Sequence, residues 1–180
     1  MAMTLLADNT ADTTDLASVS FTSGIDSTYK LYVFKFYDIN PANDDNAFQF
    51  NGSIDGGSNY NVTKTTTLFK ADHEEDDASA ALAYDTENDL VQSTAFQSLG
   101  VLVGNGADES AAGTLWLFNP SNTTYVKHFY ATTSLYSGSN PLARTSYVAG
   151  YFNNTNDIDA VQFKFASGNF DGTIKMYGVG

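Results

Sequence analysis

Carboxylates are densest at residues 72–77, where the sequence reads Asp-His-Glu-Glu-Asp-Asp. Such a cluster of oxygen ligands could hold a hard cation such as calcium. The spacing does not fit an EF-hand, because no Asp-x-Asp-x-Asp-Gly frame closed by a Glu is present. The segment is therefore predicted to be an acidic loop in contact with solvent.

Calcium could also be held between loops that are far apart in the sequence, as in some β-sandwich lectins. Asp44, Asp55 and Asp157 lie near the ends of expected strands and carry the oxygen ligands that calcium prefers. They are the calcium candidates of this sequence, although the sequence does not show whether they converge. No other metal and no other cofactor is predicted.

Catalytic groupings are missing from the sequence pattern. A retaining glycosidase needs two carboxyl groups about 5–5.5 Å apart, and no Glu-x-Asp-x-x-Glu frame supplies them. The glutamates, all in predicted loops, are Glu74, Glu75, Glu87 and Glu109. His73 and His128 accompany no Gly-x-Ser-x-Gly nucleophile elbow. The chain is therefore predicted not to be an enzyme.

Aromatic side chains are the remaining candidates for binding. Within Thr114–Phe118, Trp116 and Phe118 share one face of a strand and the two leucines share the other. Because both faces are apolar, the strand is either buried on both sides or covered by a partner, and the core is the favoured place for Trp116. The candidates for stacking on a ligand or packing in an interface are Trp116, Tyr125, His128 and Tyr130.

The elements that position these residues follow a period of two. Residues 29–37 and 161–165 alternate in the manner of strands, and 29–37 is apolar enough for a central strand. Residues 114–118 and 124–133 are separated by Asn, Pro and Ser, which predicts a hairpin. Residues 78–83 favour a helical turn but are too few to predict one. About nine to eleven short strands and no long helix result, so we expect an all-β, single-domain antiparallel β-sandwich of the jelly-roll type.

Length and charge limit the domain count and the partners. The 180 residues suit one domain, divided here into an N-terminal arm (1–20), expected to pack on a neighbour, and a β-sandwich domain (21–180). The net charge is −13, which disfavours nucleic acid and anionic membranes. The sequence has no cysteine and no signal peptide pattern.

Three segments resemble virion structural proteins of marine bacteriophages. They are residues 55–67, 114–129 and 167–178, and the similarity runs from about Phe21 to the C-terminus. The resemblance implies a phage structural protein with a jelly-roll or concanavalin-like β-sandwich. It implies no catalytic residue, and it does not distinguish head from tail.

Sequence and resemblance together predict a non-catalytic virion component, either capsid decoration or another part of the particle surface. Its expected partners are copies of itself, with a trimer favoured, and the major capsid or tail proteins of the same virion. Its expected location is the virion, assembled in the bacterial cytoplasm. The alternative is a tail-fibre or receptor-binding module that recognises host glycans.

Overall fold

The computed structural model describes residues 2–138 and 140–180 and contains twelve strands and no helix over that part of the chain. The strands are β1 (Met3–Leu16), β2 (Val19–Phe21), β3 (Leu31–Pro41), β4 (Asn46–Ser53), β5 (Lys64–Glu74), β6 (Ala80–Tyr84), β7 (Gln97–Val103), β8 (Ala111–Phe118), β9 (Lys127–Ser137), β10 (Leu142–Phe152), β11 (Ala160–Phe165) and β12 (Phe170–Val179). The all-β class is confirmed, with twelve strands where about nine to eleven were expected.

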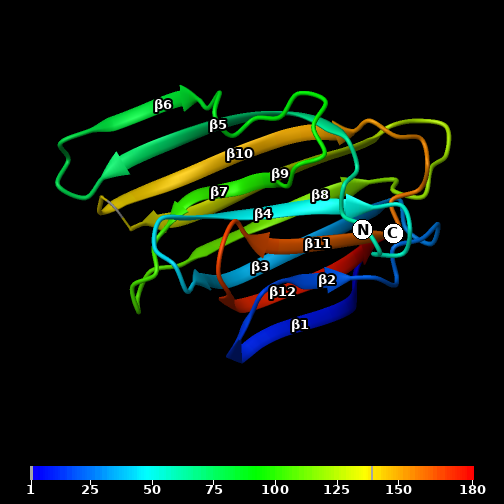
Figure 1. Cartoon of the computed structure of the whole chain (residues 1–180), viewed down its shortest axis with the longest axis horizontal. Helices are drawn as coiled ribbons and strands as arrows, with labels where there is room; N and C mark the ends of the chain where they lie inside the picture. Colours follow the sequence, from blue (N-terminus) through cyan, green and yellow to red (C-terminus); the bar gives the residue numbers. More distant parts are fainter. Residues whose placement is uncertain (1, 139) are drawn as a thin grey trace.

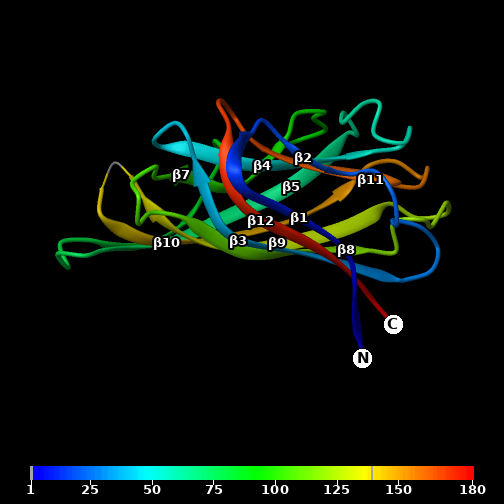
Figure 2. The same ribbon diagram turned by 90° about the horizontal axis from the view of Figure 1, so that it is seen from below.

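The strands form two layers in which every paired neighbour is antiparallel. The larger sheet has the order β1-β12-β3-β8-β9-β10-β5-β6, and the smaller has the order β7-β4-β11-β2. A single bridge between Val103 of β7 and Ser137 of β9 joins the two sheets. Figure 2 shows the smaller sheet lying over the larger one. The predicted hairpin of β8 and β9 is present.

Phenylalanines fill the space between the layers. Phe34 and Phe36 point inward from β3, and both are almost fully buried. The Phe163 ring of β11 lies 5.4 Å from that of Phe34 and 5.9 Å from that of Phe48, measured between centroids. Each such ring contributes roughly 1.5–3 kcal/mol by leaving water. The core therefore lies where the alternation of 29–37 and 161–165 indicates.

The N-terminal segment belongs to the larger sheet. β1 pairs with β12 of its own chain, from Met3 opposite Val179 to Leu16 opposite Phe170. Leu6, Ala7 and Leu16 pack against the core. Figure 2 shows the two ends of the chain projecting side by side from the larger sheet. The segment Met3–Leu16 is thus tied to residues 21–180 through a strand ladder, and packing of the N-terminal arm on a neighbour stays a prediction.

Two short segments differ from the expected pattern. The acidic segment 72–77 is not entirely a loop, because β5 continues to Glu74. Ala80–Tyr84 forms β6, which pairs with β5 and makes one edge of the larger sheet (Figure 1). Pairing with β5 supplies the hydrogen bonds that a short alanine-rich helix would otherwise make internally.

Candidate functional site: an aromatic face on the larger sheet

Strand β8 places its two kinds of apolar residue on opposite sides of the larger sheet. Leu115 and Leu117 are fully buried in the core. Trp116 and Phe118 point to the outer side, where Trp116 is half-buried and Phe118 is exposed. The preference for Trp116 in the core is therefore wrong. Only one face of β8 is covered by the smaller sheet, so the apolar side chains of its other face stay accessible to solvent.

Three aromatic rings stack across β8 and β9. Trp116 stands directly opposite Tyr130 in the strand register. Their ring centroids are 4.4 Å apart with an interplanar angle of 18°, and the Phe118 ring lies 5.8 Å from Tyr130 at 24°. Near-parallel rings at these distances attract one another beyond the burial of their area. Tyr130 is still 41% exposed, so the stack presents a flat surface to solvent.

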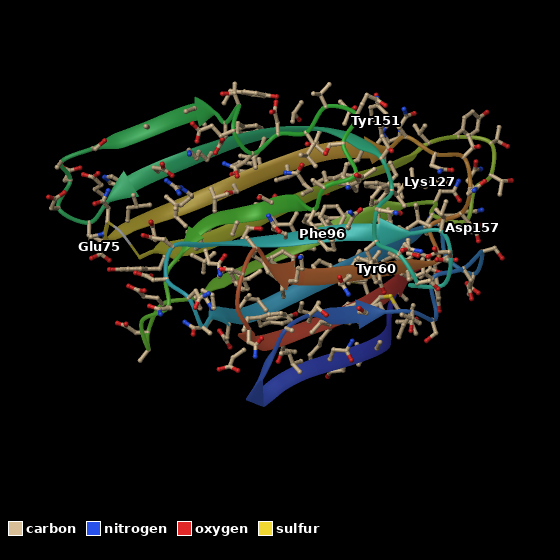
Figure 3. The ribbon with its side chains drawn as sticks, viewed as in Figure 1. Tyr60, Glu75, Phe96, Lys127, Tyr151 and Asp157 are labelled. Atoms are coloured by element: carbon tan, nitrogen blue, oxygen red, sulfur yellow. The ribbon has the colours of Figure 1, made fainter. Side chains whose placement is uncertain are left out.

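A shallow groove of about 380 Å³ runs beside this stack. Its walls include Phe118 and Tyr130 on one side and Tyr151 of β10 on the other. His128 faces Tyr151 edge-on, with centroids 5.9 Å apart. We call the set Trp116, Phe118, His128, Tyr130 and Tyr151 the aromatic face. Figure 3 shows Tyr151 and Glu75 toward opposite ends of the molecule, which separates the aromatic face from the acidic segment.

The aromatic face is uncharged at its groove. The lining of the groove contains no aspartate, glutamate, lysine or arginine, and Thr65 and Thr67 of β5 supply hydroxyls. A second groove of about 370 Å³ lies on the other side of Trp116, against Met3, Leu31 and Lys35. Flat aromatic rings flanked by a few hydroxyl groups suit a sugar ring or the apolar part of a protein surface.

A second aromatic stack lies further along the same side of the sheet. Phe69 of β5 and Tyr147 of β10 have centroids 4.8 Å apart at 13°, and both are exposed. Tyr84 of β6 stands opposite Phe69 in the register. Aromatic side chains therefore extend from β8 to the β6 edge.

Three of the four candidates for stacking or interface contact come together. Trp116, His128 and Tyr130 all belong to the aromatic face. Tyr125 lies in the connection between β8 and β9, is 70% exposed and does not line the groove. Phe118 and Tyr151 complete the face, although neither was singled out from the sequence. Phe118 carried a signal, because it lies two residues after Trp116 and therefore on the same face of the strand. Tyr151 lies on β10, and only its register with His128 of β9 brings it to the face.

The calcium candidates have separate neighbours. Asp44 accepts a hydrogen bond from the backbone N–H of Asn105 (3.2 Å). Asp55 accepts hydrogen bonds from the Asn59 side-chain amide (2.7 Å), the Ser53 hydroxyl (2.7 Å) and the Asn59 backbone N–H (2.8 Å), and these bonds lower its pKa. Asp157 lies near the Lys127 ammonium (Figure 3). Among the side chains that the structure describes, no three His, Asp or Glu residues are placed to hold a metal ion.

The acidic segment is partly neutralised by the fold. Asp72 receives two hydrogen bonds from Arg144, at 2.7 and 2.8 Å. His73 Nε2 lies 3.0 Å from Asp77 Oδ1. Partial burial, followed by the nearby carboxylate of Glu75, raises the pKa of Tyr136. The acidic segment therefore forms the end of β5 and the turn that follows it, and its contacts are made within the chain.

Two buried lysines are a feature that the sequence reasoning missed. Lys64 and Lys127 point into the core on either side of Phe152, and both are fully buried. Lys64 Nζ donates to the Ala95 carbonyl (2.5 Å), and burial lowers its pKa to about 7. Lys127 Nζ donates to the Asn154 carbonyl (3.1 Å), and its pKa is also lowered, mainly by burial.

Comparisons with known proteins assign no family to the chain. No protein-family model matches the chain, and no curated protein matches its sequence. A solved structure from Bacteroides ovatus, described as of unknown function, is similar with a TM-score of 0.32 and 6% identity. The similarity covers 59% of this chain and 46% of that one, so the chain spans less than half of that protein. In the described part of the chain, no helix is long and apolar enough to cross a membrane.

Proposed function

We propose that this chain is a non-catalytic structural component of a bacteriophage particle surface, held there through its aromatic face. The single observation that carries the proposal is the exposed stack of Trp116, Tyr130 and Phe118 on the uncovered side of the larger sheet. An apolar surface of this kind on an acidic β-protein is typical of a contact site. The resemblance of residues 114–129 to phage virion proteins falls on the same strands.

The composition supports the same assignment. The net charge of −13 keeps the surface away from packaged DNA, and the lack of cysteine suits assembly in a reducing bacterial cytoplasm. The partners we propose are copies of this chain, as a trimer, and the major capsid or tail proteins of the particle. Capsid decoration is the proposed role.

The experiment is incorporation into particles. Quantitative mass spectrometry of purified phage is expected to find many copies of the chain per particle. The variants Trp116→Ala and Tyr130→Ala are expected to fold but to be depleted from particles, because they remove the contact surface. Tyr125→Ala is the matched control, since Tyr125 is exposed and lies outside the aromatic face. Normal incorporation of the Trp116 and Tyr130 variants would contradict the proposal.

A second candidate is a tail-fibre or receptor-binding module that recognises host glycans, and the uncharged groove favours it. Tyr151 and the stacked Tyr130 ring bound the groove, with Thr65 and Thr67 hydroxyls nearby. A sugar ring would stack on Tyr130 while its hydroxyls bond the groove wall. Glycan-array binding by the wild type that is lost in Tyr130→Ala would support this candidate. Binding to no glycan, with or without calcium, would remove it.

A further inference from the structure

Strand β6 forms an edge of the larger sheet that is open along its length. All five of its residues, Ala80–Tyr84, are exposed, and Leu82 is 74% exposed. Among the described strands, β6 pairs only with β5. Figure 1 shows it at the margin of the larger sheet, with no strand beyond it.

The register with β5 shows which backbone groups are unused. The Glu74 N–H donates to the Ser79 carbonyl (2.9 Å) at the start of the ladder, and antiparallel pairs alternate from there. Ala81 and Ala83 therefore direct their N–H and C=O groups toward β5. The residues whose N–H and C=O groups point away from the sheet are Ala80, Leu82 and Tyr84.

Protection against strand pairing is missing from this edge. Natural sheets block an edge with charged side chains, proline, a bulge or a very short strand. The edge strand β2 has only three residues, and β1 carries Asp8 in an ion pair with Lys175 (2.9 Å). β6 reads Ala-Ala-Leu-Ala-Tyr, and its register with β5 is regular. A strand that is open, uncharged and apolar is suited to accept another strand.

The charges on either side of β6 favour a particular kind of partner strand at this edge. Four acidic residues in the turn at 74–77 precede β6, and Glu87 and Asp89 follow β6. The intervening Asp85 is paired with Lys70 at 3.0 Å and is buried. An uncharged strand is thus bordered by negative charge at both ends. A second copy would bring the same acidic borders to the contact, whereas a segment with basic borders would be attracted.

We propose that the β6 edge binds an extended segment of a partner protein by strand addition, and that this segment has uncharged, β-favouring residues in its middle and lysine or arginine at both ends. Its backbone bonds the outward groups of Ala80, Leu82 and Tyr84. Its apolar side chains pack beside Leu82 and Tyr84, next to the stack of Phe69 and Tyr147. The inference is independent of the aromatic face, which lies on β8, β9 and β10.

The test uses the whole chain and a fluorescent peptide of sequence Lys-Lys-Val-Thr-Val-Thr-Val-Lys-Lys. Binding measured by fluorescence anisotropy is expected, with protection of the amides of Ala80, Leu82 and Tyr84 from hydrogen exchange. Leu82→Pro removes an outward N–H but no bond to β5, and proline is tolerated at such a position of an edge strand. We expect affinity to fall about tenfold or more in Leu82→Pro and to change less in Leu82→Ala, which keeps the N–H.

A second measurement leaves the protein unchanged. The same peptide with N-methyl groups on the residues that face β6 has lost its donors and is expected to bind about tenfold or more weakly. A peptide with glutamate in place of lysine is expected not to bind. Equal binding of the N-methylated peptide, absence of binding by the lysine peptide, or a dimer of the chain that Leu82→Pro abolishes would each overturn the proposal.

Discussion

At the scale of single residues, Trp116 is a surface residue that a sequence pattern places in the core. Trp116→Ala removes its contact with Tyr130 while Leu115 and Leu117 stay buried. We expect urea denaturation to show a loss of about 1–2 kcal/mol in the free energy of unfolding. Tyr125→Ala, the control, is expected to change it by less than about 0.5 kcal/mol. A loss of about 3–5 kcal/mol for Trp116→Ala, as for a core tryptophan, would contradict the placement.

Lys64 makes the stability depend on pH. Its pKa is about 7 in the folded chain and 10.5 as the reference value, so between these values the unfolded chain binds a proton that the folded chain does not. Stability should therefore be full above about pH 10.5 and fall as the pH drops toward about 7. Lys64→Met is expected to lower the slope of stability against pH by about 1.4 kcal/mol per pH unit in this window, measured by urea denaturation.

The control for Lys64 is Thr67→Met, an exposed replacement on the same strand. It keeps Lys64 and should keep the slope of the wild type. Parallel curves for Lys64→Met and the wild type would show that Lys64 is not the group responsible.

The buried lysines also show how far residue types can mislead. Lys64 has the same parity as Val62 and Leu68, and Lys127 has the same parity as Phe129, so the alternation places both lysines inward. Lysine is almost never fully buried, so the residue type argues against an inward position for either lysine. The carbonyls of Ala95 and Asn154 that accept their hydrogen bonds come from connections distant in sequence. No pattern around the lysines indicates these partners.

At the scale of elements, Arg144 ties the two sheets together. It lies on β10, is buried, bonds Asp72 of β5 and donates from Nη1 to the Val101 carbonyl of β7 (3.1 Å). Asp72→Asn leaves a buried guanidinium without its charged partner, and we expect the free energy of unfolding to fall by about 2–4 kcal/mol. Asp77→Asn is the control, because the Asp77 side chain is 92% exposed. Equal effects of the two substitutions in chemical denaturation would contradict this role of Arg144.

Strands with an apolar face of their own can be predicted from the sequence, whereas strands and strand ends that depend on pairing cannot. The alternation of 29–37 and 161–165 identifies β3 and β11, which are held by their own buried faces. The alanines of 78–83 carry no such alternation, and β6 exists because β5 offers a ladder. The same ladder extends β5 into the acidic segment as far as Glu74. Tertiary pairing overrides local propensity at these places.

At the scale of the whole molecule, the excess of negative charge should oppose folding. The net charge is −13, and self-repulsion destabilises a compact state until salt screens it. We expect the Tm to rise by about 2–4 °C between about 0.02 and 0.5 M sodium chloride, measured by scanning calorimetry. A variant with Asp76→Asn and Asp77→Asn should respond less, because it carries two fewer negative charges. Both side chains are exposed, so the substitutions disturb no packing. A Tm that falls with salt would contradict the expectation.

The antiparallel all-β class follows from the sequence, but the order of strands does not. β1 and β12 pair residues from opposite ends of the chain, such as Met3 and Val179, and no local pattern specifies that contact. The aromatic face also depends on strand pairing that no local pattern specifies. Its members lie on β8, β9 and β10, and only the register of these strands brings Trp116, Tyr130 and Tyr151 to one side. Trp116, His128 and Tyr130 were predictable as candidates, whereas Tyr151 and the common surface were not.

The proposed structural role is tested most directly by electron cryo-microscopy of purified phage particles. We expect many copies of the chain on the particle surface, with the outer side of the larger sheet, including Trp116 and Tyr130, covered by a neighbouring protein. Particles that lack the chain, or that carry it with this side open to solvent and another side in contact, would contradict this role.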